Sequence, residues 1–111
     1  MKLSYLPLHA IACAFTTNAA IVNFYSDNNC AQFVGTRNIW DNTCAPGNPA
    51  FKSFMVTTAG GDGQNLLTNS NQGDCPYSTQ TGCFNAQTVG VCNWVWEGTS
   101  YSIGSSRGIS C

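Results

Sequence analysis

Cysteine usage constrains the fold of this chain more than any other feature. Seven cysteines occur in 111 residues, and all but Cys13 lie beyond residue 20. An even number of cysteines in a short chain is typical of a disulfide framework formed in an oxidising compartment. No two of them are spaced as CxxC, so neither a zinc site nor a redox motif is indicated. The expected disulfide cysteines are Cys30, Cys44, Cys75, Cys83, Cys92 and Cys111.

The start of the chain has the features of a secretory signal peptide. Lys2 gives a short positive region, residues 3–15 are mostly apolar, and small residues that end at Ala20 suit signal peptidase. The apolar run is too short to span a bilayer. The sequence therefore predicts cleavage of residues 1–20 and a secreted, extracellular product without a membrane span. Residues 21–111 are expected to form one disulfide-rich domain.

Charge and histidine content exclude several classes of function. Beyond the predicted signal peptide, three basic residues face five acidic ones, so binding to nucleic acids or anionic membranes is not expected. The single histidine, His9, belongs to the predicted signal peptide. The mature chain then lacks the residue needed for Ser-His-Asp or Cys-His catalysis and for His-ligated metals. We expect a protein that is not an enzyme and uses no metal or cofactor.

Short stretches of alternating apolar and polar residues, separated by turn-forming residues, indicate β-strands. No window shows helical periodicity, and the turn-forming residues 41–49 are expected to be irregular. This pattern predicts an all-β sandwich or barrel. The expected strands are residues 21–25, 31–40 with a bend at Gly35, 51–58, 64–68, 88–96 and 99–103.

The two halves of the predicted domain contain a similar order of residues. The first half has Tyr25 and Ser26, then Cys30, Cys44 and Ser53, and the second half has Tyr77 and Ser78, then Cys83, Cys92 and Ser100. This order predicts a β-motif that is used twice. In this interpretation, the stretch Ile21–Cys30 is the first strand and turn of the first copy.

Several of these residues resemble the Greek-key motif of βγ-crystallins. In that motif an aromatic pair with an acidic residue opens a folded hairpin, which here matches Phe24, Tyr25 and Asp27. A serine near the end of the motif packs over the hairpin, and Ser53 takes that position. The chain is also similar to killer-toxin-like proteins and to small secreted cysteine-rich proteins of filamentous fungi, many of them effectors or elicitors. The resemblance implies a small Greek-key β-sandwich held by disulfides.

The resemblance also has consequences for single residues. The crystallin hairpin has a glycine where this chain has Gln32, and Gly35 can replace it only in a longer hairpin. The calcium signature of such motifs is only partly kept, with Asn48 and Ser53 in the first half, so no metal site is expected.

Cysteine spacing alone leaves fifteen pairings open. The resemblance, together with the duplication, implies one of them. The implied pairs are Cys30–Cys44, Cys83–Cys92 and Cys75–Cys111.

Three tryptophans are candidate ligand-binding residues. Trp40, Trp94 and Trp96 could form an aromatic platform for stacking sugars. Alternation places Trp94 and Trp96 on the same strand face as Cys92, and such a face more often belongs to the core. Binding and core packing are therefore competing interpretations.

Other polar residues also have two interpretations. Asp27 and Glu97 could act as a carboxylate pair in glycoside hydrolysis, but a turn aspartate and a loop glutamate are the expected roles. Residues 69–74 could be a recognition loop or an inert connection. Isolated charges such as Arg37 are expected to solvate the surface.

The sequence predicts a secreted, non-enzymatic, monomeric protein that recognises an unknown protein or polysaccharide. The leading hypothesis is an effector, elicitor or toxin-like protein that acts on another organism. The alternative is a carbohydrate-binding or cell-wall-associated module that uses its tryptophans. Protease inhibition is a third possibility, and it rests on fold analogy alone.

Overall fold

The computed structural model describes residues 19–96 and 98–107. This part of the chain is all-β, as the sequence predicts, and its only helical element is a short 3-10 turn, η2 (Tyr77–Thr79). The strands are β1 (Ala19–Tyr25), β2 (Phe33–Trp40), β3 (Cys44–Ala45), β4 (Ser53–Thr58), β5 (Gln64–Asn69), β6 (Gln80–Asn85), β7 (Cys92–Trp94) and β8 (Ser102–Arg107).

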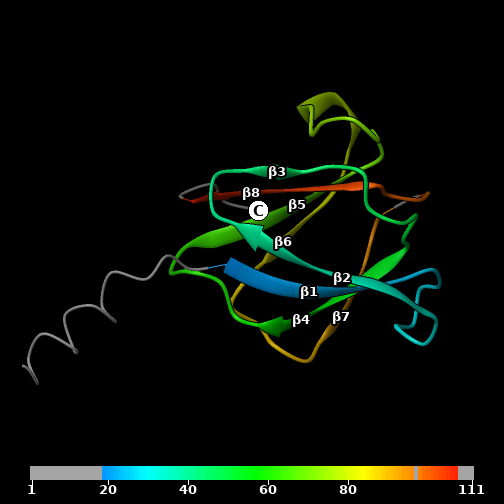
Figure 1. Cartoon of the computed structure of the whole chain (residues 1–111), viewed down its shortest axis with the longest axis horizontal. Coiled ribbons are helices and arrows are strands. Elements are labelled where there is room, and N and C mark those ends of the chain that lie inside the picture. The colour runs from blue at the N-terminus through cyan, green and yellow to red at the C-terminus, as the bar shows by residue number, and fades with distance from the viewer. Residues whose placement is uncertain (1–18, 97, 108–111) are drawn as a thin grey trace, which may run out of the picture.

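The strands form two four-stranded antiparallel sheets that pack against each other (Figure 1). One sheet has the order β2-β1-β4-β7, and the other has the order β6-β5-β8-β3. The first half of the chain, β1 to β4, contributes β3 to the second sheet and its other strands to the first sheet. The second half, β5 to β8, contributes β7 to the first sheet and its other strands to the second sheet. Because of this exchange, the first half cannot form its complete sheet without the second.

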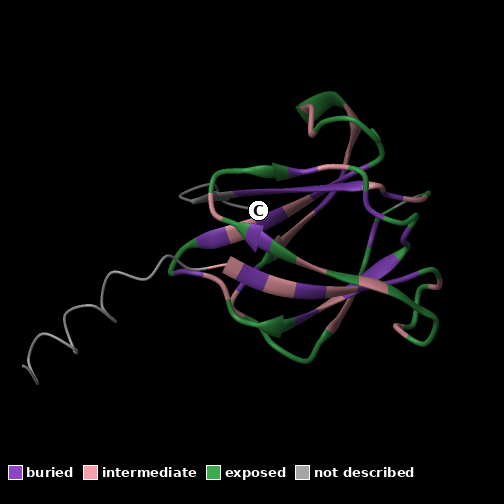
Figure 2. Cartoon of the chain, viewed as in Figure 1, coloured by how far each residue is buried: buried purple, intermediate pink, exposed green. Residues whose placement is uncertain are grey.

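The core lies between the sheets and consists of apolar residues. Figure 2 shows how buried positions alternate along strand β1. Four phenylalanine rings form a continuous chain of contacts through the core. Ring centroids are 4.5 Å apart for Phe24 and Phe51, 6.5 Å for Phe51 and Phe54, and 5.0 Å for Phe54 and Phe84. The aromatic chain therefore connects β1 and β4 of the first sheet to β6 of the second. Hydrophobic burial of this kind is the main favourable contribution to folding.

A pair of hydrogen bonds joins the two halves where they meet. The N–H of Phe51 donates to the carbonyl of Ser100, and the N–H of Ser100 donates back to the carbonyl of Phe51, both at 2.9 Å. Phe51 lies two residues before β4, and Ser100 lies two residues before β8. Phe51 and Ser100 therefore hold equivalent positions in the two halves, in a different register from the predicted one. Ser53 corresponds to Ser102, not to Ser100.

The loops that follow β1 and β5 repeat the same hydrogen bond. The N–H of Ser26 donates to the carbonyl of Gln32 at 2.9 Å, and the N–H of Ser70 donates to the carbonyl of Thr79 at 3.0 Å. The predicted match between Ser26 and Ser78 is therefore wrong. The second loop is longer and contains η2. Tyr77 and Ser78 belong to this 3-10 turn, so they do not occupy the positions that Tyr25 and Ser26 occupy in the first half.

Each of these loops is hydrogen-bonded to the first residue of the last strand in its half, which is Ser53 of β4 or Ser102 of β8. The hydroxyl of Ser53 donates to the carbonyl of Asp27 at 2.6 Å and accepts the N–H of Cys30 at 3.2 Å. The hydroxyl of Ser102 donates in the same way to the carbonyl of Asn71. Both serines are fully buried, so each loop is hydrogen-bonded to a buried hydroxyl at the start of a strand.

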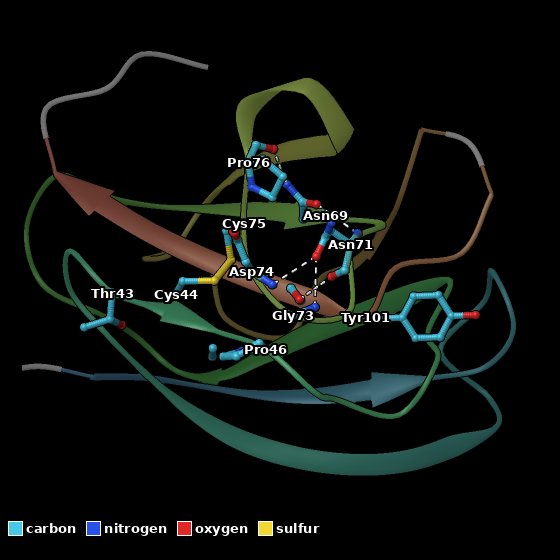
Figure 3. The surroundings of a disulfide bond; sticks show 12 residues. Thr43, Cys44, Pro46, Asn69, Asn71, Gly73, Asp74, Cys75, Pro76 and Tyr101 are labelled. Carbon is cyan, nitrogen blue, oxygen red and sulfur yellow. Dashed lines mark hydrogen bonds between the residues drawn. A yellow bond between two sulfur atoms is a disulfide. The ribbon is translucent and has the colours of Figure 1, made fainter.

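Two disulfides repeat the same pattern. Cys30 follows β1 and bonds to Cys92 at the start of β7, while Cys75 follows β5 and bonds to Cys44 at the start of β3 (Figure 3). The loop after β1 is thus joined to β7, which the second half contributes to the first sheet. The loop after β5 is joined to β3, which the first half contributes to the second sheet. Cys83 is also disulfide-bonded.

The predicted cysteine pairs are wrong because strand exchange carries Cys44 and Cys92 away from their own halves. Cys30 does not bond to Cys44, Cys83 does not bond to Cys92, and Cys75 does not bond to Cys111. Cys111 itself lies outside the described residues. The structure confirms that the other five of the six expected cysteines form disulfides.

The strand predictions find β1, β2, β4, β5 and β7, overlap only the start of β8, and miss β3 and β6. The two-residue strand β3 lies within residues 41–49, which were expected to be irregular, and β6 was not predicted at all. The hairpin residue with positive φ is Cys30, at 56°, rather than Gln32 or Gly35.

The predicted signal peptide lies almost entirely outside the described residues. Strand β1 begins at Ala19, two residues before the predicted start of the domain, and Ala20 is fully buried. Within residues 19–96 and 98–107, no helix is long and apolar enough to cross a membrane.

Candidate functional site

Strand β7 lies at the edge of its sheet, and its last residue, Trp94, and Trp96 two residues further on are exposed to solvent. Trp94 is 61 % exposed and Trp96 is 66 % exposed, whereas Val95 between them is only 4 % exposed. Because Val95 takes the inward position, alternation directs both tryptophans outward. The interpretation of Trp94 and Trp96 as core residues is therefore wrong.

The two tryptophans border a hollow of about 280 Å³, which we call the tryptophan hollow. It is lined by Phe84, Cys92, Asn93, Trp94 and Trp96. Phe84 comes from β6, which is the edge strand of the second sheet. The hollow thus lies where the edges of the two sheets meet, and it offers aromatic surfaces and one carboxamide.

The segment that carries the tryptophans is anchored to both sheets. The N–H of Val95 donates to the carbonyl of Lys52 at 3.0 Å, and the N–H of Trp96 donates to the carbonyl of Thr81 at 2.8 Å. The disulfide to Cys30 fixes the start of β7. These anchors hold the backbone of both tryptophans in place before any ligand binds.

The third candidate, Trp40, lies far from the other two. It is 47 % exposed at the end of β2 and pairs with Ala19 at the start of β1. Strand β2 is the opposite edge of the sheet from β7, and Trp94 pairs with Ser53 at the other end of β4. The structure therefore brings Trp94 and Trp96 together and separates Trp40 from them.

A second hollow, which the sequence did not indicate, lies beside the first. It measures about 390 Å³ and is lined by Ser70, Ser78, Thr79, Gln80, Thr81, Gly98 and Thr99. We call it the hydroxyl hollow because most of its lining side chains are alcohols. The run of hydroxyl and amide residues from Ser78 to Thr81 was the only sequence signal for it.

Asp27 has a structural role. Its carboxylate accepts the N–H groups of Gln32 at 2.9 Å, Ala31 at 3.1 Å and Asn29 at 3.3 Å. The hydrogen bond from Gln32 is the main reason why the pKa of Asp27 is lowered from its ordinary value of 3.8, against an opposing effect of desolvation. This is the expected turn aspartate. Its hypothetical catalytic partner, Glu97, lies outside the described residues.

The state of Asp27 should make stability depend on pH. A carboxyl group whose pKa is lowered by folding stabilises the fold above its unfolded pKa, and this contribution is lost as the pH falls through the folded pKa. In Asp27→Asn the titrating group is gone. We therefore expect the difference in unfolding free energy between wild type and variant, measured in urea, to be largest near pH 7 and to shrink below about pH 4. A difference that stays constant down to pH 2 would contradict this role.

Arg37 does more than solvate the surface. Its guanidinium donates to the carbonyl of Pro46 and to Oδ1 of the buried Asn48, the latter at 2.9 Å. The amide nitrogen of Asn48 in turn donates to the carbonyls of Ala45 and Tyr101. The oxygen that the partial calcium signature would offer is thus bonded to a guanidinium, so these residues do not fit a calcium ion.

Residues 69–74 form a structured loop (Figure 3). Oδ1 of Asn71 accepts the N–H groups of Gly73 at 2.9 Å and Asp74 at 3.1 Å, much as Asp27 does in the first half. The loop ends at Cys75, which is bonded to Cys44. Its internal hydrogen bonds favour the interpretation as a connection. In the described part of the chain, no three His, Cys, Asp or Glu residues gather to hold a metal ion.

No family model, curated protein or solved structure matches this chain.

Proposed function

We propose that this protein is a secreted, non-enzymatic carbohydrate-binding protein, and that Trp94 and Trp96 form its binding surface. The observation that carries the proposal is the exposure of two neighbouring indoles on a strand anchored to both sheets. Full burial of a large apolar side chain stabilises a protein by roughly 1.5–3 kcal/mol. Two such side chains held in water therefore point to a ligand that covers them.

The chemistry of the tryptophan hollow favours sugars. A pyranose ring presents C–H groups on its faces, which pack on an indole, and hydroxyls at its edge, which need polar partners. The carboxamide of Asn93 supplies both a donor and an acceptor beside the two indoles. Nucleic-acid bases also stack on tryptophan, but their phosphates need basic residues, and none of the described residues that line the hollow is basic.

The described residues that line the two hollows carry neutral side chains, which suit a binding protein better than a glycosidase. Glycoside hydrolysis normally needs two carboxyl groups on either side of the scissile bond. None of the described residues that line either hollow is Asp or Glu. We infer that the protein holds its ligand without cleaving it.

We further infer that the fold is a βγ-crystallin-like double Greek key. In each half the fourth strand returns to pair with the first, as β4 does with β1 and β8 does with β5. The rings of Tyr25 and Phe33 meet edge-on across the first hairpin at 6.1 Å, and Ser53 packs over that hairpin. Of these features, the packing of Ser53 over the hairpin is the one that the sequence resemblance implies.

A sugar-binding surface is compatible with an effector, elicitor or toxin-like role. A secreted protein that recognises the wall polysaccharides of another organism is thereby concentrated at that organism's surface. We propose this broader role on the predicted signal peptide and the disulfide framework. No observation on the described residues favours protease inhibition over it.

The test is binding to chitin, glucan and mannan oligosaccharides. Titration of the wild type should change its intrinsic tryptophan fluorescence with at least one of them. Calorimetry should then show that Trp94→Ala and Trp96→Ala each bind that sugar about ten- to a hundredfold more weakly, since the packing of one indole contributes roughly 1.5–3 kcal/mol.

Trp40→Ala is the matched control, because it removes an equally large side chain from the opposite edge of the sheet. It should bind as the wild type does. A wild type that binds none of the three sugar classes would refute the proposal, and so would a Trp40→Ala variant that loses binding as the other two do.

A further inference from the structure

The two hollows are lined by residues that are connected through the backbone of strand β6. Trp96 lines the tryptophan hollow and Thr81 lines the hydroxyl hollow, and the backbones of these two residues are joined by a 2.8 Å hydrogen bond. Thr81 and Phe84, which line different hollows, belong to the same strand, β6. The hollows therefore follow one another along the edge of the second sheet.

The hydroxyl hollow has free polar groups on its surface. Within the described chain, the side chains of Ser78, Gln80 and Thr99 make no hydrogen bond, although each is at least partly exposed. By contrast, the hydroxyl of Thr81 is bonded to Thr68 at 2.9 Å and serves the core. The free alcohols and the carboxamide can donate and accept, which is what sugar hydroxyls require.

Size and charge define the class of ligand. The hollows measure about 280 and 390 Å³, and sites for small ligands usually span about 300–1,000 Å³. Each hollow alone is small, but the pair can hold several linked sugar units. The described residues that line the two hollows are neutral at pH 7, so among them an anionic sugar would find no cationic partner.

We propose that the two hollows form one continuous groove for a neutral, linear polysaccharide, in which Trp94 and Trp96 stack one sugar unit while Ser78, Gln80 and Thr99 hydrogen-bond units further along the chain. This inference rests on the proposed carbohydrate-binding function and adds a second subsite to it. In the groove, a polymer makes two sets of contacts for a single loss of translational freedom. Affinity should therefore rise with the length of the oligosaccharide.

The test compares disaccharides with hexasaccharides of chitin, β-glucan and mannan by calorimetry. The wild type should bind the hexasaccharide of its preferred sugar at least tenfold more tightly than the disaccharide. The double variant Gln80→Ala/Thr99→Ala should lose on the order of tenfold in affinity for the hexasaccharide and keep its affinity for the disaccharide. Trp94→Ala should lose affinity for both.

Gln32→Ala is the control, because it removes an exposed glutamine side chain that lines neither hollow. Equal affinity of the wild type for both lengths, or an unchanged hexasaccharide affinity in Gln80→Ala/Thr99→Ala, would overturn the extended groove and leave the tryptophan site standing. Tighter binding of an oligogalacturonate hexamer than of every neutral hexamer would overturn the neutral ligand class. Absence of any binding by the wild type would remove the proposed function and the groove together.

Discussion

Replacement of Cys30 and Cys92 by serine is expected to destabilise the protein by about 4 kcal/mol and to abolish sugar binding at the tryptophan hollow. The bond joins residues 62 positions apart, and closing a loop of that length lowers the entropy of the unfolded chain by about this amount in free energy. The effect on binding has a separate cause. Strand β7 pairs with β4 over three residue pairs only, and the disulfide is attached to its first residue.

Without the bond, β7 is a three-residue edge strand with one neighbour, and such strands fray easily. Fraying would release Trp94 from the position in which it faces a ligand. Stability is measured by urea denaturation, and binding by calorimetry with a disaccharide, which tests the tryptophan hollow alone.

The second disulfide provides a matched control. Cys44–Cys75 closes a loop of 31 residues and should contribute nearly as much to stability as the first bond. It lies on β3, at the edge of the second sheet opposite to β6. Cys44→Ser/Cys75→Ser should therefore lose stability to a similar extent and keep its affinity for the disaccharide. Equal loss of affinity in both double variants would show that binding follows global stability and that the first bond has no local role.

The all-β class and the long strands could be predicted because they depend on local patterns. Alternation in β1 places Val22 and Phe24 in the core. The glycine-rich turn Gly60–Gly63 follows β4, as expected. Strand β6 was missed because its sequence, QTGCFN, does not alternate clearly. Its inward positions include Thr81, whose hydroxyl is satisfied by Thr68, and this partner comes from a strand that a local pattern does not reveal.

The disulfide pairing could not be predicted because it depends on strand exchange. The predicted duplication implied that Cys30 and Cys44 would pair within one half. In the structure, Cys44 begins a strand that has left its own sheet, so its neighbour in space is Cys75. The choice among pairings is made by tertiary contacts, and cysteine spacing does not contain them.

Part of the candidate site was predictable. The sequence identified Trp94 and Trp96, and alternation correctly placed them on one face. It could not decide which face points inward, because Val95 and the tryptophans are all apolar. The structure decides this through the edge position of β7, where only the Val95 side meets the opposite sheet. Trp40 shares the residue type of the site but not its location.

Truncation of Phe54 is expected to cost about 3–5 kcal/mol in unfolding free energy, as Phe→Ala changes in well-packed cores do. Phe54 is fully buried, and its ring meets Phe51 and Phe84 edge-on from β4. Phe54→Ala would leave a cavity between the sheets that these neighbours cannot fill without moving. Urea denaturation measures the loss. Tyr77→Ala, which truncates a 75 % exposed ring, should change stability by less than about 0.5 kcal/mol.

Phe54→Ala should also weaken sugar binding, because Phe84 forms part of the tryptophan hollow and rests on the ring of Phe54. When the supporting ring is removed, Phe84 can move toward the cavity and change the shape of the hollow beneath the bound sugar. Phe54→Leu fills most of the cavity and should recover most of the stability and affinity. Affinity in folded Phe54→Ala equal to that of the wild type would mean that the hollow is supported by the backbone of β6 alone, without help from the core.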